Sequence, residues 1–146
     1  MKPYGSILEF TRERNADLMR AYRLQISCAR NIKMKEIRAA IVNMPASRFW
    51  VSEERATIVV SDLLSGRPLP KNMRPTKCEM FLEIYRRVLE LRKERPTATV
   101  YDLVSEVINS PAPKFYMRPR AAMDIIYKIK KGYYDEFFKA HPVTGR

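Results

Sequence analysis

Pro45-Ala46-Ser47-Arg48-Phe49-Trp50-Val51 returns in modified form 66 positions later as Pro111-Ala112-Pro113-Lys114-Phe115-Tyr116-Met117. Each copy follows an asparagine, Asn43 or Asn109, and opens a stretch of helical apolar spacing that ends at a glycine, Gly66 or Gly132. Because a repeated sequence unit is typical of a repeated fold, this interval predicts a tandem duplication.

The similarity extends outward from both copies and preserves the size and polarity of the side chains. Ile41-Val42 corresponds to Val107-Ile108, and Leu63 corresponds to Ile129. Two cores built to one plan tolerate such exchanges best. Further upstream the offset falls to 63, so the second unit has three extra residues near Pro96, where a loop accepts them. The alternative is a chance similarity of amphipathic helices, against which the shared asparagine, Pro-Ala and phenylalanine argue.

Apolar residues at helical spacing predict three helices in each unit. The first unit is expected to have helices from Asn15, over about 33–43, and from Ser52 to Gly66; the second has them over about 76–95, 99–109 and 119–131. No run alternates apolar and polar residues as a strand with hairpin turns does. The predicted fold is all-α, a tandem duplication of a three-helix, helix-turn-helix-like unit that forms either two cores or one body.

These patterns divide the chain into five parts. They are an N-terminal arm (1–14), a first three-helix unit (15–66), a basic Pro-rich linker (67–77), a second three-helix unit (78–132) and an aromatic C-terminal tail (133–146). The expected core consists of apolar and aromatic side chains at matching positions: Leu18, Tyr22, Ile37, Ile41, Phe49, Val59, Val60, Leu63, Phe81, Tyr85, Leu103, Val107, Phe115, Ile125, Ile126 and Ile129.

The net charge indicates a polyanionic partner. The chain has 28 Lys and Arg against 16 Asp and Glu, a net charge of +12 and a pI near 10. An excess this large on a short chain favours nucleic acid, double-stranded DNA in particular, although solubility alone is the other interpretation. The excess is +4 up to Gly66 and +8 after it, which favours the second unit and its flanks.

The start of the third helix separates the two repeats chemically. It reads Ser52-Glu53-Glu54-Arg55 in the first and Arg118-Pro119-Arg120 in the second. A cationic helix N-terminus is a ready anion site, so the second copy is the expected contact for nucleic acid. The acidic start is either N-terminal capping or a contact for a basic surface of another copy, which would join subunits in a homo-oligomer. The candidate nucleic-acid-binding residues are Lys114, Arg118, Arg120, Lys128, Lys130 and Lys131, with Arg67, Lys71 and Arg74 between the units.

Catalytic and membrane functions find little support. The single histidine, His141, stands in the polar tail, and no catalytic set, phosphate loop or metal-ligand cluster is visible, so we expect a non-enzymatic protein without metal or cofactor. Cys28 and Cys78 are expected to be reduced. No apolar run approaches the ~18 residues that span a bilayer, and the start Met1-Lys2-Pro3-Tyr4-Gly5 lacks the apolar run of a signal peptide. The expected location is the cytoplasm or an assembly made there.

The phrases at 43–56, Asn-x-Pro-Ala-Ser-Arg-Phe-Trp-Val-Ser-Glu-Glu-Arg-Ala, and at 109–116, Asn-Ser-Pro-Ala-Pro-Lys-Phe-Tyr, resemble those of small basic proteins encoded by crAss-like bacteriophages and related prophages. The resemblance covers most of residues 15–132. It implies a phage or mobile-element setting but transfers no functional residues. The expected function is DNA binding, mainly to phosphates, by the second unit; the alternative is a structural subunit of a phage virion or of a DNA-packaging ring, resembling an adaptor or a small terminase and contacting other phage proteins.

Overall fold

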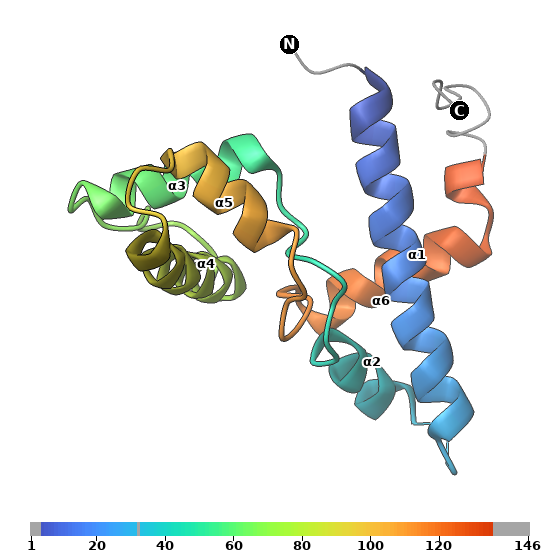
Figure 1. Cartoon of the computed structure of the whole chain (residues 1–146). Coiled ribbons are helices and arrows are strands. Elements are labelled where there is room, and N and C mark those ends of the chain that lie inside the picture. The colour runs from blue at the N-terminus through green and yellow to red at the C-terminus, as the bar shows by residue number, and fades with distance from the viewer. Residues whose placement is uncertain (1–3, 32, 136–146) are drawn as a thin grey trace. The chain divides into compact units, whose positions relative to one another are not determined.

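The computed structural model describes residues 4–31 and 33–135, and those residues form helices and connecting segments without a strand (Figure 1). The expected all-α class is therefore confirmed. The helices are α1 (Tyr4–Cys28), α2 (Met34–Val42), α3 (Glu53–Leu64), α4 (Pro75–Glu94), α5 (Val100–Ile108) and α6 (Pro119–Lys130). A short helical segment follows at 133–135, and the rest of the aromatic tail lies outside the described residues.

The helices are grouped into two compact units that do not follow the chain order. Unit 1 comprises Met1–Met44 with Arg118–Arg146, and unit 2 comprises Pro45–Met117. In unit 1, α6 packs on α1 and α2, whereas in unit 2, α3 packs on α4 and α5. Each unit thus takes two helices from one sequence repeat and the third helix from the other.

This grouping differs from the boundaries expected from the sequence. The repeats end at Gly66 and Gly132. The chain, however, passes from unit 1 to unit 2 between residues 44 and 45 and returns to unit 1 between residues 117 and 118. The Pro-rich linker after Gly66 lies inside unit 2, because it joins α3 to α4 and these two helices pack together. The second helix of a repeat does not fold with its own third helix, so the helix-turn-helix-like pairs are α2 with α6 and α5 with α3.

The two related turn segments hold each other within unit 2. The amide of Ala46 donates to the carbonyl of Ala112, and the amide of Ala112 donates to the carbonyl of Ala46, both at 3.0 Å. The amide of Phe49 donates to the carbonyl of Ile108, also at 3.0 Å. Backbone groups of each turn therefore hydrogen-bond to the other repeat. This pairing explains why neither turn returns its third helix to its own repeat.

Local structure nevertheless repeats at the interval seen in the sequence. N-caps fall at Lys33 and Thr99 and again at Ser52 and Arg118, each pair 66 positions apart. The glycines that follow the two third helices both have positive φ, 87° at Gly66 and 79° at Gly132, where a side chain would be strained. Descent from one duplicated block stays a prediction. The caps and the glycines recur at this interval, but Tyr116 has a positive φ of 58° and its counterpart Trp50 does not.

The first helix begins earlier than the sequence predicts. Residues 1–14 were assigned to an arm, yet α1 starts at Tyr4 and the side chain of Leu8 is only 1% exposed. Leu8 precedes Asn15 by seven residues and Tyr22 by 14, which is about two and four helical turns, so it continues the inner stripe. Asn15, expected as an N-cap, lies inside the helix and is buried. A polar residue within the stripe concealed the continuation of the helix.

Most of the expected core is buried. Eleven of the 16 side chains are buried, and the other five are half-buried at the rims of the units: Tyr22, Leu63, Tyr85, Ile125 and Ile129. The turn aromatics Phe49 and Phe115 are buried, as the core interpretation of these rings requires.

Glu83 on α4 organises contacts inside unit 2. Its carboxylate accepts hydrogen bonds from Arg86 and Arg87, both at 2.8 Å. Arg87 also donates to the carbonyl of Pro111 at 2.9 Å, and its guanidinium lies 5.1 Å from the ring centre of Phe49. The hydrogen bond from Arg86, together with that from Arg87, lowers the pKa of Glu83 from 4.5 to about 2 although partial burial opposes the shift.

Replacing Glu83 by Gln should therefore give a pH-dependent loss of stability. Because the folded-state pKa is lowered, the carboxylate stabilises the fold above about pH 4.5, and this contribution disappears as the pH falls towards 2. Since Arg86 is largely exposed, we expect a loss of about 1 kcal/mol at pH 7. Urea unfolding at pH 7, 4.5 and 2.5 measures it, with Glu90→Gln as the exposed control. If the stability difference between the parent and Glu83→Gln does not shrink at low pH, the ionised Glu83 carboxylate is not its cause.

Candidate nucleic-acid interface

Four basic side chains line one groove of unit 1. Lys35 and Arg38 come from α2, while Arg118 and Arg120 come from the beginning of α6. The groove has a volume of about 730 Å³ and Asp124 is the only carboxylate among its lining residues. The packing of α6 on α2 brings the four cations together, although Arg38 and Arg118 are 80 positions apart in the sequence.

The helical period explains why Lys35 and Arg38 face this groove. Ile37 and Ile41 are buried and form the inner stripe of α2, which leaves positions 35 and 38 towards the outer side. Lys35 is exposed and Arg38 is half-buried. Lys35 and Arg38 are not among the residues predicted from the sequence, because the repeat predicts that the second helix packs on the acidic third helix of its own repeat.

None of the four groove cations has a carboxylate partner within residues 4–31 and 33–135. Arg118 and Arg120 are both exposed. Arginine side chains of this protein otherwise pair readily, as in the bridge of Arg95 with Glu106. The groove therefore keeps its charge available for an anion.

The N-terminus of α6 adds backbone donors to this charge. Arg118 is the N-cap residue, and no side chain caps the helix. Pro119 has no N–H, and the first intrahelical bond runs from the amide of Ala122 to the carbonyl of Arg118. The amides that precede Ala122 point out of the helix end, where the macrodipole also favours negative charge. Such an end binds phosphate or sulfate readily.

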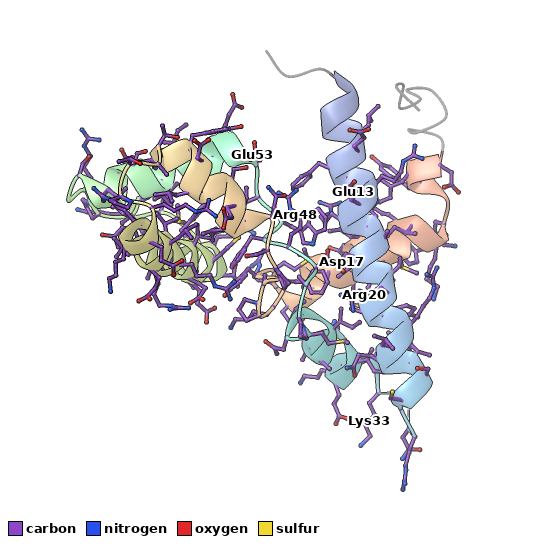
Figure 2. All side chains as sticks on the ribbon, viewed as in Figure 1. Glu13, Asp17, Arg20, Lys33, Arg48 and Glu53 are labelled. Atoms are coloured by element: carbon purple, nitrogen blue, oxygen red, sulfur yellow. The ribbon has the colours of Figure 1, made fainter. Side chains whose placement is uncertain are left out.

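The matching position of unit 2 is closed. There Glu53 replaces Pro119, and its carboxylate accepts hydrogen bonds from Tyr101, from Ser105 at 2.7 Å and from Asn109 at 3.4 Å. Figure 2 shows Glu53 at the beginning of α3. The hydrogen bond to this carboxylate and the negative charge of Glu53 raise the pKa of Tyr101. Ser52 caps α3 by accepting from the amide of Arg55 at 3.1 Å.

The acidic start of α3 is therefore a capped helix N-terminus, which agrees with the capping interpretation. Glu53 and Glu54 stand in the first turn of α3, and Glu53 is committed to the α5 side chains of its own unit. A contact between this carboxylate and another copy of the chain would have to compete with these bonds, and it stays a prediction. The difference between the repeats is a filled acidic site against an open basic groove.

The lysines at the C-terminal end of α6 contact aromatic rings. Lys130 donates to the hydroxyl of Tyr22 at 3.0 Å, which fastens α6 to α1. The ammonium of Lys128 lies 5.2 Å from the ring centre of Tyr133. Lys131 is the C-cap residue of α6, where the dipole favours cations even without a ligand. All three lysines are exposed and belong to unit 1.

The remaining expected contacts belong to unit 2. Lys114 is paired with Glu79 at 2.8 Å, and Arg67 is paired with Asp62 at the same distance. Lys71 and Arg74 are exposed in the segment before α4, and Arg74 is the N-cap residue of that helix. Lys114 and the groove arginines were expected to act together, but they fall in different compact units.

The two units differ in charge. Unit 1 carries 16 basic and seven acidic residues, an excess of nine, whereas unit 2 carries 12 basic and nine acidic residues, an excess of three. The division of the sequence at Gly66 had placed most of the excess in the later half. The exchange of third helices moves it to the unit that also contains the open groove.

Within residues 4–31 and 33–135, no group of three or more His, Cys, Asp or Glu side chains could hold a metal ion. None of the helices in this part of the chain combines the length and apolarity needed to cross a membrane. His141 lies outside the described residues. Comparison with protein-family models, with curated proteins and with solved structures found no match.

Proposed function

We propose that the chain is a non-enzymatic DNA-binding protein whose unit 1 binds the phosphates of duplex DNA. The observation that carries the proposal is the groove of four cations, none of which has a carboxylate partner among the described residues, at an uncapped helix N-terminus. Lysine and arginine side chains together with helix N-termini supply most of the phosphate contacts in protein–DNA complexes. The charge excess of unit 1 agrees with this role.

The candidate residues contribute unequally in this proposal. Arg118 and Arg120 are the central contacts, joined by Lys35 and Arg38 from α2. The lysines at the C-terminal end of α6 extend the basic surface of the same unit. Lys114 and Arg67 contribute less, because each already pairs with a carboxylate. The setting that we propose, a phage-infected bacterial cytoplasm or a virion, rests on the expected resemblance to crAss-like phage proteins.

The test is the salt dependence of duplex binding. With Z neutralised phosphates, log K falls against log[salt] with a slope of about −0.9Z, and we expect Z of roughly four to seven. Replacing both Arg118 and Arg120 by alanine removes about two contacts, so the slope should flatten by about 1.8 units. Fluorescence anisotropy of a labelled duplex measures both the slope and the affinity, which should fall roughly tenfold or more at low salt.

The matched control is Arg92→Ala with Lys93→Ala on α4, which removes the same charge from exposed positions of unit 2. This pair should leave the slope within about 0.5 of the parent value. If both double variants change binding equally, the protein acts through net charge and the groove has no special role.

A structural subunit of a virion or packaging ring is the second candidate. Leu82 and Leu89 favour it, because they lie seven residues apart on α4 and are 49% and 37% exposed. Light scattering with and without duplex DNA separates the two functions. A monomer or dimer that gains mass with DNA supports the first, and a large closed oligomer indifferent to DNA supports the second.

A further inference from the structure

The outer face of α6 combines the groove with an exposed aromatic ring. Arg120, Asp124, Tyr127 and Lys131 are spaced by four, three and four residues, so they share one side of the helix. Ile126 is buried on the opposite side, while Tyr127 is 61% exposed. A large aromatic side chain left this open on a helix that packs against two others is not needed for the core.

One lysine lies over this ring, and another lies over a second exposed tyrosine. The ammonium of Lys131 lies 5.5 Å from the ring centre of Tyr127, and that of Lys128 lies 5.2 Å from the ring centre of Tyr133, which is also 61% exposed. Neither lysine has a carboxylate partner within the part of the chain that the structure describes. The nearest acids in sequence are Asp124, four residues before Lys128, and Asp135, four residues after Lys131, and both are exposed.

Exposed rings among unpaired lysines match the chemistry of single-stranded nucleic acid. Each unpaired base offers a flat π-face to an aromatic side chain, while the backbone phosphates attract the neighbouring cations. In a duplex the faces of the bases are already stacked on one another, so a ring on a helix surface cannot reach them without extruding a base. The lysine over each ring can turn to a phosphate and leave the ring to the base.

We propose that Tyr127 and Tyr133 stack on unpaired bases of a single-stranded nucleic acid segment whose phosphates are held by Lys128 and Lys131. The proposal deepens the proposed function, because it adds a single-stranded segment to the ligand of unit 1. Arg120 and Lys131 are about 16 Å apart along the helix at 1.5 Å per residue. The stacking site and the groove can therefore be altered independently.

The experiment compares two labelled probes, a 12-residue thymidine oligonucleotide and a hairpin duplex, by fluorescence anisotropy. Replacing Tyr127 by Ala should weaken binding of the single strand by about five- to a hundredfold, the range for loss of one stacked base, and change duplex binding less than about twofold. Tyr127→Phe should keep single-strand affinity within about twofold, because stacking needs the ring and not the hydroxyl. Tyr133→Ala should act like Tyr127→Ala.

Tyr101→Ala is the matched control, because it removes a 49% exposed tyrosine from unit 2. It should leave binding of the thymidine probe unchanged. Single-strand affinity that survives both Tyr127→Ala and Tyr133→Ala, or a parent protein that does not bind the thymidine probe, overturns the stacking site. In either case the effect of the Arg118 and Arg120 substitutions on the duplex probe decides the proposed function separately.

Discussion

Cutting the chain at a protease site inserted after Lys71 is expected to leave both fragments in one particle. The first fragment carries α1, α2 and α3, and the second carries α4, α5 and α6. Unit 1 needs α6 from the second fragment, and unit 2 needs α3 from the first. Lys71 is exposed in the segment between α3 and α4, so the inserted site is accessible and no helix is cut.

The fragments should separate only when the protein is unfolded. Size-exclusion chromatography with light scattering should give the mass of the whole chain after cleavage in native buffer and two smaller species in 6 M guanidinium. Each fragment made alone should have low helicity by circular dichroism, because its third helix exposes the apolar side that it buries in the whole protein. For α3 this side includes Ala56, Val59 and Val60.

The uncut insertion variant is the control, and its unfolding curve should match that of the parent. Two folded, separable fragments of native helicity would contradict the exchange of third helices. They would instead restore the grouping of each repeat with its own three helices. The two arrangements place the same helices in the same order, so few other measurements distinguish them as directly.

The helices themselves were predictable because their signals are local. Ser52 and Thr99 accept from the amide three residues ahead, as N-caps do. Pro75 and Pro119 occupy the first turns of α4 and α6, where a missing N–H does no harm. Such signals depend on three or four neighbouring residues, which the sequence displays completely.

The partners of the helices were not predictable in the same way, and the reason is the repeat itself. Ile37 and Ile41 of α2 match Leu103 and Val107 of α5 in size and polarity. An apolar stripe on α3 can therefore pack on either helix at similar cost. What distinguishes them is the reciprocal hydrogen bonding of the two turns, a contact between segments 66 positions apart that no periodicity reveals.

Only part of the candidate site was predictable, because some of its residues carry a local signal and the others depend on helix packing. Arg118 and Arg120 indicate a cationic helix start, and the sequence shows it because the two residues are neighbours of the helix start. Lys35 and Arg38 look like a solvated face until α6 is known to pack on α2. Their spacing of three residues, on the side away from Ile37, was the available signal. It indicates a binding groove only when α6 is known to pack on α2.

Replacing Phe49 by Ala should cause a large loss of stability in unit 2. The side chain of Phe49 is fully buried, and its ring stacks on that of Tyr116 with a centroid distance of 5.9 Å. The guanidinium of Arg87 lies over the same ring. Truncation removes these contacts and leaves a cavity, which costs about 3–5 kcal/mol. A domain is stable by only about 5–15 kcal/mol, so unit 2 should be close to unfolding.

The fluorescence of Trp50 allows the loss of stability to be measured in unit 2. It is the only tryptophan of the chain, it belongs to unit 2, and it is 8% exposed. Its fluorescence during urea unfolding therefore follows unit 2, while circular dichroism follows all helices. Ile58→Ala is the control, since Ile58 is 55% exposed on α3 and should change stability by less than about 0.5 kcal/mol. Phe49→Leu should fall between the two because it fills part of the space.

Phe49→Ala should also weaken the association of the two fragments, because Phe49 lies in one of the paired turns. Both turn segments belong to unit 2, so loosening Phe49 also loosens the pairing of Ala46 with Ala112. The third helices would then lose the contact that separates the exchanged arrangement from the local one. We therefore expect Phe49→Ala, combined with the cut after Lys71, to release the fragments at urea concentrations that leave the cut parent intact. Release at the same concentration in both would show that the turns do not hold the exchange.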